Sequence, residues 1–347
     1  GSLSALLRSR VLSWRGLVRA AGDVVIPGKI VGDDVSLGGF VRRRFGNEVA
    51  ERLVDPLMAG TRAGDIDRMS MRMAAEPIFE AATKHRSVTL ALGRAKRGQQ
   101  RPRFLGLKGG MSRLVDALAE RSDADVHLST PVRRVTRSGA GFVVEADDVE
   151  IEADAVVVAV PAHAAASVLA DVAPSAARRL ADFTFASVSV VNLLYPPGAV
   201  RVPSTGSGLL VPRSERASIA ACTWVSSKWP DEAPADGRLL LRCVVGRGET
   251  GPEGDISDDD DIVARASADV RRFLGAEGDP IATAVHRWER ALPRFVVGHR
   301  ARVAAIENEL AEVGNLSLVG AGYTATGLND CLLQGLRIAD SIASARD

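Results

Sequence analysis

The sequence predicts a mixed fold with α/β and α+β parts, in which a helical N-terminal portion precedes two sheets of different construction. Three observations support this class. Residues 3–92 place apolar side chains at helical spacing and contain no convincing alternating strand. The run DAVVVAVP, from Asp154 to Pro161, is apolar on both faces, as a buried parallel strand is. From about Phe183 to Arg290 the apolar and polar residues alternate, which is typical of antiparallel strands.

The first segment, SALLRSRVLSWRGLVRAAGD, predicts a basic amphipathic helix pair that is interrupted near Gly16. Two interpretations of its basic face stay open at this point. The face either contacts acidic lipid headgroups at a membrane surface or is the solvated side of a helix that packs on the core. The arginines concerned are Arg8, Arg10, Arg15 and Arg19.

The central region begins after the linker GRAKRGQQRPR. The run FLGLKGGMSRLVDALAER predicts a strand, a turn at Gly109 and Gly110, and a helix with Ser112 as its N-cap. Four short strands follow, in DVHLSTPVRRVTRS, GFVVEA, VEIEA and DAVVVAVP, and Pro161 then introduces an alanine-rich helix.

The antiparallel region contains the runs FASVSVVNLLY, SGLLVP, SIAACTWVSS, RLLLRCVVG and IATAVHRWER, with one helix over about 258–274. NLSLVG and the final helix return to the parallel style. We therefore expect the parallel-sheet domain to be assembled from segments that are far apart in the sequence.

Composition excludes several classes of function. The chain has 347 residues, 46% hydrophobic and 25% charged, with a formal net charge of +1, which supplies no field for nucleic acid. Its three cysteines contain no C-x-x-C, which favours free thiols in a reducing cytosolic compartment and speaks against metal and disulfide sites. No apolar run approaches the ~20 residues that cross a bilayer, so any membrane contact is expected to be peripheral.

The tail of the chain carries the one feature that points to chemistry. Hydrolytic motifs such as G-x-S-x-G and H-E-x-x-H are absent, and the five histidines are scattered. In NLSLVGAGYTATGLNDC, Gly320, Gly322 and Ala325 match G-x-G-x-x-G/A, but the sequence stops at Asp347, before a second parallel strand with a ribose-binding acid. We interpret the segment as a strand, a glycine turn and a helix N-terminus, which suits the anionic edge of a reduced flavin; an ordinary strand-to-helix turn is the alternative.

The ordered runs of the sequence resemble the protoporphyrinogen and coproporphyrinogen oxidases, which are flavin enzymes of haem biosynthesis in the amine-oxidase superfamily. The resemblance covers nearly the whole chain. The runs that carry it are SLGGFVRRRFGNEVAERLVDPLMAGTRAGDIDRMSMR, KHRSVTLAL, LKGGMSRLVDALA, ADAVVVAVP, SVSVVNLLYP, SSKWP, RALPRFVVGH and GLNDCLLQGLRIADSI. The resemblance also implies that the N-terminal βαβ unit, which grips the FAD pyrophosphate in the family, precedes the first residue here and is lacking.

The resemblance implies a division into three domains. Residues 1–100 form a helical domain that faces substrate or membrane, 101–168 and 301–347 are segments of a Rossmann-like FAD-binding domain, and 169–300 form a substrate-binding β-sheet domain. For the cofactor, it places Val132 beside the adenine, Gly320 at the strand end, and Thr326, Gly327 and Leu328 beside the isoalloxazine.

The resemblance further implies that MAGTRAGD lies beside the porphyrinogen, with Gly60 and Gly64 in the pocket wall. Family members usually have an aromatic residue where Arg62 stands. A guanidinium there suits the propionates of the substrate, whereas a surface ion pair of Arg62 with Asp65 or Asp67 is the alternative.

The implied reaction is the FAD-dependent oxidation of a porphyrinogen, either coproporphyrinogen III or protoporphyrinogen IX, with O2 as the electron acceptor. No catalytic base, oligomeric state or metal is implied, and we expect no nucleic-acid partner. Two other interpretations stay open: a non-catalytic tetrapyrrole-binding module, and a related flavin amine oxidase or desaturase. Absorption of bound flavin would separate the enzymes from the module.

Overall fold

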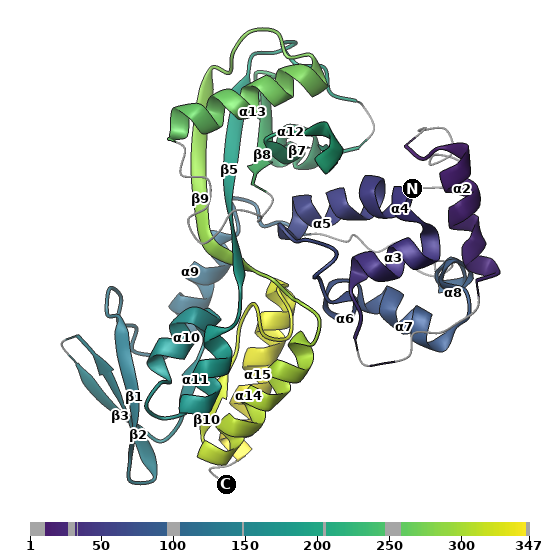
Figure 1. Ribbon diagram of the computed structural model, residues 1–347. Coiled ribbons are helices and arrows are strands. Elements are labelled where there is room, and N and C mark those ends of the chain that lie inside the picture. The colour runs from purple at the N-terminus through teal and green to yellow at the C-terminus, as the bar shows by residue number, and fades with distance from the viewer. Residues whose placement is uncertain are drawn as a thin grey trace. The chain divides into compact units, whose positions relative to one another are not determined.

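The structure is a computed structural model that describes residues 11–26, 32, 34–95, 105–147, 149–203, 206–246 and 258–344 (Figure 1). Within these ranges the chain forms two compact units. Unit 1 comprises Gly1–Ala124 and Ala186–Leu292, and unit 2 comprises Asp125–Phe185 and Pro293–Asp347. Helices and both kinds of sheet are present, so the predicted mixed class is confirmed. The division into three functional domains stays a prediction, and Arg8 and Arg10 lie outside the described residues.

The N-terminal part of unit 1 is built from short helices that pack around one apolar core. This core gathers Leu37, Phe40, Val41, Met58 and Ile66, all buried. Ser36 caps the second of these helices by accepting a hydrogen bond from the Gly39 amide at 3.1 Å. The helical segments are α2 (Trp14–Ala21), η1 (Gly22–Val24), α3 (Leu37–Phe45), α4 (Asn47–Val49), η2 (Ala50–Val54), α5 (Asp55–Arg62), α6 (Met71–Ala74), α7 (Glu76–Lys84), α8 (Val88–Ala95) and α9 (Ser112–Arg121).

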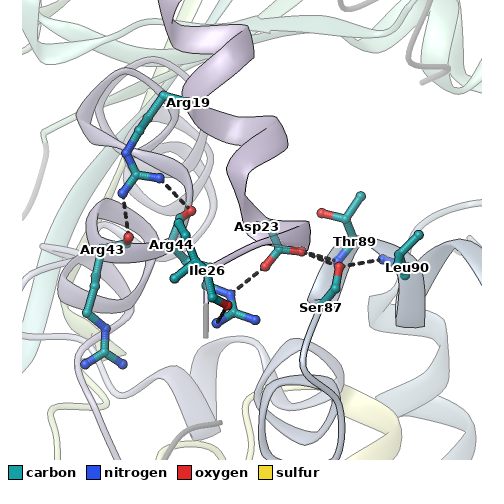
Figure 2. Close-up of polar contacts among 8 residues, drawn as sticks. All are labelled: Arg19, Asp23, Ile26, Arg43, Arg44, Ser87, Thr89 and Leu90. Atoms are coloured by element: carbon teal, nitrogen blue, oxygen red, sulfur yellow. Dashed lines mark hydrogen bonds and ion pairs between the residues drawn. The ribbon is translucent and has the colours of Figure 1, made fainter. Parts of the chain in front are cut away.

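A buried ion pair joins three of these segments (Figure 2). The Asp23 carboxylate, in η1, accepts hydrogen bonds from Arg44 Nε at 2.5 Å, Ser87 Oγ at 2.7 Å and the Thr89 amide at 2.9 Å. Ser87 also caps α8, because its hydroxyl accepts from the Leu90 amide at 3.2 Å. We call Asp23, Arg44, Ser87 and Thr89 the aspartate cluster. It connects α3 and α8 to η1, the segment that follows α2.

The sheet of unit 1 has the strand order β6-β7-β8-β5-β9, with antiparallel pairing of β6 to β7, β7 to β8 and β8 to β5. Residues of β5 alternate between the two faces, and Val191, Leu193 and Tyr195 are fully buried in a core that α13 shares. The strands are β5 (Phe185–Tyr195), β6 (Gly208–Leu210), β7 (Ile219–Trp224), β8 (Leu239–Val245) and β9 (Ala282–Pro293), and the helical segments are η3 (Arg213–Glu215), α12 (Val225–Lys228), η4 (Pro230–Glu232) and α13 (Asp259–Leu274).

Unit 2 contains a three-stranded antiparallel sheet and a two-stranded parallel sheet. In the parallel sheet, Leu316 pairs with Val156 and Leu318 with Val158, which confirms that separated segments form this sheet. Its core includes Leu169, Leu180 and Ile306. The elements are β1 (Val132–Ser138), β2 (Gly141–Ala146), β3 (Glu150–Ala153), β4 (Val156–Val158), α10 (Ala162–Val168), α11 (Pro174–Ala181), α14 (His299–Val313), β10 (Leu316–Leu318) and α15 (Leu328–Ser344).

Two local predictions differ from the structure. Residues 105–107 do not form a strand, because no pairing partner lies beside them within the described chain. Ser112 is not an N-cap either: α9 begins at Ser112 itself, and Met111 precedes it without a side-chain cap. The turn before the helix is confirmed, with Gly109 and Gly110 at φ of +86° and +96°. Among the described helices, none is long and apolar enough to cross a membrane.

Candidate functional site

The segment predicted to meet a flavin lies at the end of the parallel sheet in unit 2. Since β4 and β10 are parallel, their carboxyl ends share one edge, and the Val319 amide extends the ladder with a hydrogen bond of 3.0 Å to the Val158 carbonyl. In open α/β sheets, ligands bind in the crevice outside the carboxyl ends of the strands. Residues 319–327, which we call the tail loop, leave the sheet at this edge.

The backbone of the tail loop requires glycine at two positions. Gly320 and Gly322 have φ of +122° and +104°, which L side chains rarely adopt. A Cβ on Gly322 would also lie 3.2 Å from Cβ of Pro293. The Gly320 amide donates to Oε1 of Gln334 on α15 at 3.2 Å, so the helix holds the start of the loop.

The end of the tail loop is open to solvent. Thr326, Gly327 and Leu328 are exposed and stand at the N-terminus of α15, a helix of 17 residues. The amides of its first turn supply partial positive charge without a titrating side chain. The structure thus brings together four of the five residues predicted to contact the cofactor.

Asp330 modifies this helix N-terminus. A Cβ on Gly327 would lie 2.6 Å from Asp330 Oδ2, so the carboxylate folds back beside the start of the helix. The exposed backbone at 326–328 fits the polar edge of a flavin ring. The carboxylate adds a negative charge next to that position, which opposes charge on a bound anion.

Val132, the fifth predicted cofactor residue, belongs to a different part of unit 2. It is the first residue of β1, is 42% exposed, and pairs with Ala146 in the three-stranded sheet. Its side chain is therefore accessible, but it lies in the antiparallel sheet and not in the parallel pair. Its contact with adenine stays a prediction.

A buried histidine and a buried tyrosine fix the middle of the tail loop to the core of unit 2. His299 Nε2 lies 2.8 Å from the Tyr323 carbonyl, and the Tyr323 hydroxyl donates to the Val160 carbonyl at 2.6 Å. In the sequence, His299 is one of five scattered histidines. The signal that was available is its place in RALPRFVVGH, one of the runs that carry the resemblance.

The predicted pocket residues Gly60, Arg62 and Gly64 come together at the end of α5 in unit 1. Gly60 faces the sheet: a Cβ there would lie 2.8 Å from Cδ2 of Leu210 and 3.0 Å from Cβ of Ala221. The absence of a side chain at Gly60 thus lets α5 approach β6 and β7 closely. Gly64 is buried, and a Cβ there would overlap the Met69 side chain. Packing explains these glycines, and their role in a pocket wall stays a prediction.

Arg62 is the one cation of this group. It is partly buried in the last turn of α5, and burial lowers the pKa of its guanidinium. The predicted alternative was an ion pair with Asp65 or Asp67. Asp67 instead pairs with Arg42, and within the described chain no carboxylate pairs with Arg62. A partly desolvated guanidinium without an anionic partner there is suited to bind an anionic ligand.

Metal ligation receives no support in this part of the structure. Across the described residues, no cluster of three His, Cys, Asp or Glu side chains is arranged to hold a metal ion. The chemistry that the geometry favours depends on backbone groups and a cationic side chain.

Comparison with known proteins identifies the relatives of the chain. Residues 3–343 match the family described as flavin containing amine oxidoreductase. Coproporphyrinogen III oxidase of Bacillus subtilis (strain 168) is 33% identical over 344 residues, which cover 96% of this chain and 72% of the relative. Coproporphyrinogen III oxidase of Propionibacterium freudenreichii subsp. freudenreichii is 30% identical, with 96% and 69% covered.

The fold has a solved counterpart as well. A crystal structure of a protein from Exiguobacterium sp. 255-15, provisionally named a protoporphyrinogen oxidase, aligns with a TM-score of 0.82 and 26% identity. The alignment covers 96% of this chain and 73% of that protein. A reduced UDP-galactopyranose mutase aligns with a TM-score of 0.69 at 12% identity, which indicates a shared fold alone.

Proposed function

The chain belongs to the flavin containing amine oxidoreductase family, and we propose that it oxidises a porphyrinogen, with coproporphyrinogen III as the leading substrate, in haem biosynthesis. The observation that carries this proposal is the 33% identity with the Bacillus subtilis coproporphyrinogen III oxidase along nearly the whole chain. The likeness to chloroplastic protoporphyrinogen oxidases is weaker, at 29% identity for the one from Oryza sativa subsp. japonica.

Gly320, Thr326, Gly327 and Leu328 are proposed to hold the flavin ring, and Val132 to lie beside the adenine. When bound, FAD supplies the electron sink for removal of hydride from the substrate. The tail loop contributes backbone that approaches the ring closely, and the first turn of α15 contributes amides that favour negative charge. Since the cofactor supplies the redox chemistry, the protein needs no acid–base group at the loop itself.

Arg62 is proposed to bind a propionate of the substrate, and Gly60 and Gly64 to line the same pocket. The partial burial of Arg62 and its lack of a carboxylate partner among the described residues support this role. We expect Arg62→Ala to raise the KM for coproporphyrinogen III by about ten- to a hundredfold, since a charge-assisted hydrogen bond contributes roughly 1.5–3 kcal/mol. Arg62→Lys should recover part of the loss. Arg68→Ala is the control, because Arg68 is exposed in the same segment; an unchanged KM in Arg62→Ala contradicts the role.

One experiment tests the function as a whole. The purified chain is mixed with FAD, freed of unbound cofactor, and supplied with coproporphyrinogen III or protoporphyrinogen IX in air while porphyrin fluorescence and O2 are followed. Bound flavin, porphyrin formation and O2 consumption support the proposal, including O2 as the acceptor. Porphyrin binding without flavin would instead indicate a non-catalytic tetrapyrrole-binding module. A bound flavin that oxidises amines but no porphyrinogen would indicate a related amine oxidase.

Peripheral membrane contact is proposed through one face of α2. Trp14 and Val18 lie one helical turn apart and are 70% and 65% exposed, and Arg15 lies over the Trp14 ring at 5.4 Å. Apolar and basic groups on one surface favour binding to an anionic bilayer. The three free cysteines fit a reducing, cytosolic location of the protein. Sedimentation with phosphatidylglycerol vesicles should weaken severalfold in Trp14→Ser relative to wild type. Equal binding of both proteins would exclude this face.

A further inference from the structure

The tail loop is held by two buried residues that cannot themselves touch a ligand. His299 and Tyr323 are each 2% exposed, and both belong to unit 2. His299 opens α14, directly after Gly298 with φ of +80°. Tyr323 lies in the middle of the loop, next to Gly322.

The contact between them fixes the protonation of the histidine ring. A backbone carbonyl only accepts hydrogen bonds, so the 2.8 Å contact with the Tyr323 carbonyl requires the proton on Nε2 of His299. The ring is also confined on two sides: its centroid is 4.9 Å from that of Phe183 and 4.8 Å from that of Phe295. The donor therefore has one position and one direction.

The tyrosine side chain supplies the second attachment. It enters the core of unit 2, and its hydroxyl donates to the Val160 carbonyl at 2.6 Å, just beyond the end of β4. Burial raises the pKa of Tyr323, so the hydroxyl remains a donor at neutral pH. One residue of the loop is thus attached through its carbonyl to α14 and through its hydroxyl to the segment that follows β4.

Within the loop, the Gly322 amide donates to the Ala325 carbonyl at 3.0 Å. Gly320 and Gly322 carry the conformational freedom of glycine, and folding must fix it. Thr324 and Thr326 on the far side are exposed. The contacts of Tyr323 therefore act together with the Gly320–Gln334 hydrogen bond to fix where residues 326–328 lie.

We propose that His299 and Tyr323 form a clamp that positions the tail loop, and that His299 is a positioning residue for the flavin. The second half of this proposal rests on the proposed function. The clamp itself does not, since it is a property of the loop with or without a ligand.

Two variants remove one attachment each, and one restores it. His299→Leu removes the hydrogen-bond donor and fills the buried position with an apolar side chain. Tyr323→Phe removes only the hydroxyl. His299→Gln supplies a side-chain amide N–H that can donate to the Tyr323 carbonyl in place of the ring. The matched control is Tyr195→Phe, because the sequence has two tyrosines and Tyr195 is the other one, fully buried in unit 1.

The first measurement is hydrogen exchange of the amides at 319–328 in the full chain without FAD. Exchange about tenfold faster in His299→Leu and Tyr323→Phe, and close to wild type in His299→Gln and Tyr195→Phe, supports the clamp. Unchanged exchange in both of the first two variants overturns it.

The second measurement is a fluorescence titration with FAD, together with the visible spectrum of the bound flavin. Because His299→Leu loses one buried hydrogen bond, its Kd for FAD should be roughly three- to tenfold higher than that of wild type. His299→Gln should restore the wild-type Kd. Faster exchange with an unaltered Kd and spectrum overturns the positioning role and leaves the clamp. A wild-type chain that binds no FAD overturns the positioning role in this chain. The porphyrinogen assay then decides the proposed function, and the exchange result decides the clamp separately.

Discussion

Replacement of Asp23 by asparagine should destabilise unit 1 strongly. Asp23 is fully buried, and its carboxylate accepts from Arg44, Ser87 and Thr89 (Figure 2). The asparagine amide turns one of these acceptors into a donor that faces another donor, and Arg44 loses its anionic partner. Breaking a buried ion pair in this way costs about 3–5 kcal/mol. That cost is a large share of the 5–15 kcal/mol that roughly separates folded from unfolded domains.

The pH dependence of this effect has a definite sign. Burial raises the pKa of Asp23, but the hydrogen bonds from Thr89, Ser87 and Arg44 outweigh it, so the pKa lies below its ordinary value of 3.8. A carboxylate with a lowered folded pKa stabilises the protein above its ordinary pKa and loses this contribution as pH falls through the folded value. The difference between wild type and Asp23→Asn should therefore be full at pH 7 and shrink below about pH 3.8.

Urea unfolding followed by tryptophan fluorescence measures the difference at each pH. The control is Asp67→Asn, because Asp67 pairs with Arg42 on the same helix as Arg44 but is 51% exposed. Exposed pairs contribute about 0–1 kcal/mol, so the control should stay near wild type. A loss below about 1 kcal/mol in Asp23→Asn at pH 7, or a difference that does not change in acid, would refute the reasoning.

Three further predictions concern glycines and the start of α15. Gly60→Ala should destabilise the chain by about 1–3 kcal/mol, because the added methyl group overpacks against Leu210 and Ala221. Gly93→Ala lies in a helix with nothing within 4 Å of the added methyl group, and it should stabilise the chain by about 0.5–1 kcal/mol. Thermal unfolding of both variants measures the two effects. Gly322→Ala should cost about 1–3 kcal/mol from backbone strain and slow FAD uptake, which stopped-flow fluorescence would detect; a wild-type rate and stability contradict it. Asp330→Asn should raise the flavin midpoint potential by about 20 mV, since removal of a negative charge worth about 1 kcal/mol favours the reduced ring. Asp340→Asn, at the far end of the same helix, should leave the potential unchanged.

Local sequence patterns predicted the sheets well because their signals lie within each strand. The alternation over 185–195 reappears as the alternating burial of β5, and the two-faced apolar run at 154–161 became β4 of the parallel pair. The strand expected at 105–107 failed for a physical reason. A strand is stable only beside a partner, and no local pattern reports whether a partner is present.

The candidate site was predictable in part for the same reason. Thr326, Gly327 and Leu328 are consecutive, so one run of sequence contains them all. His299 meets Tyr323 across 24 positions, and the Tyr323 hydroxyl meets Val160 across 163. The nearest neighbours of Gly60, Leu210 and Ala221, belong to strands far along the chain, and its place in a pocket wall stays a prediction. Such contacts become visible only once the chain is folded.

The runs that carry the family resemblance meet one another through buried polar contacts. Arg44 of SLGGFVRRRF and Ser87 of KHRSVTLAL both bind Asp23, and His299 of RALPRFVVGH holds the loop that leads into GLNDCLLQGLRIADSI. A flavin takes over the electron chemistry, so the protein must above all hold backbone and helix ends in place. Three residues of these runs, Arg44, Ser87 and His299, therefore fix local geometry through buried polar contacts. Of the three, His299 is the one whose substitution should alter flavin binding without contacting the flavin.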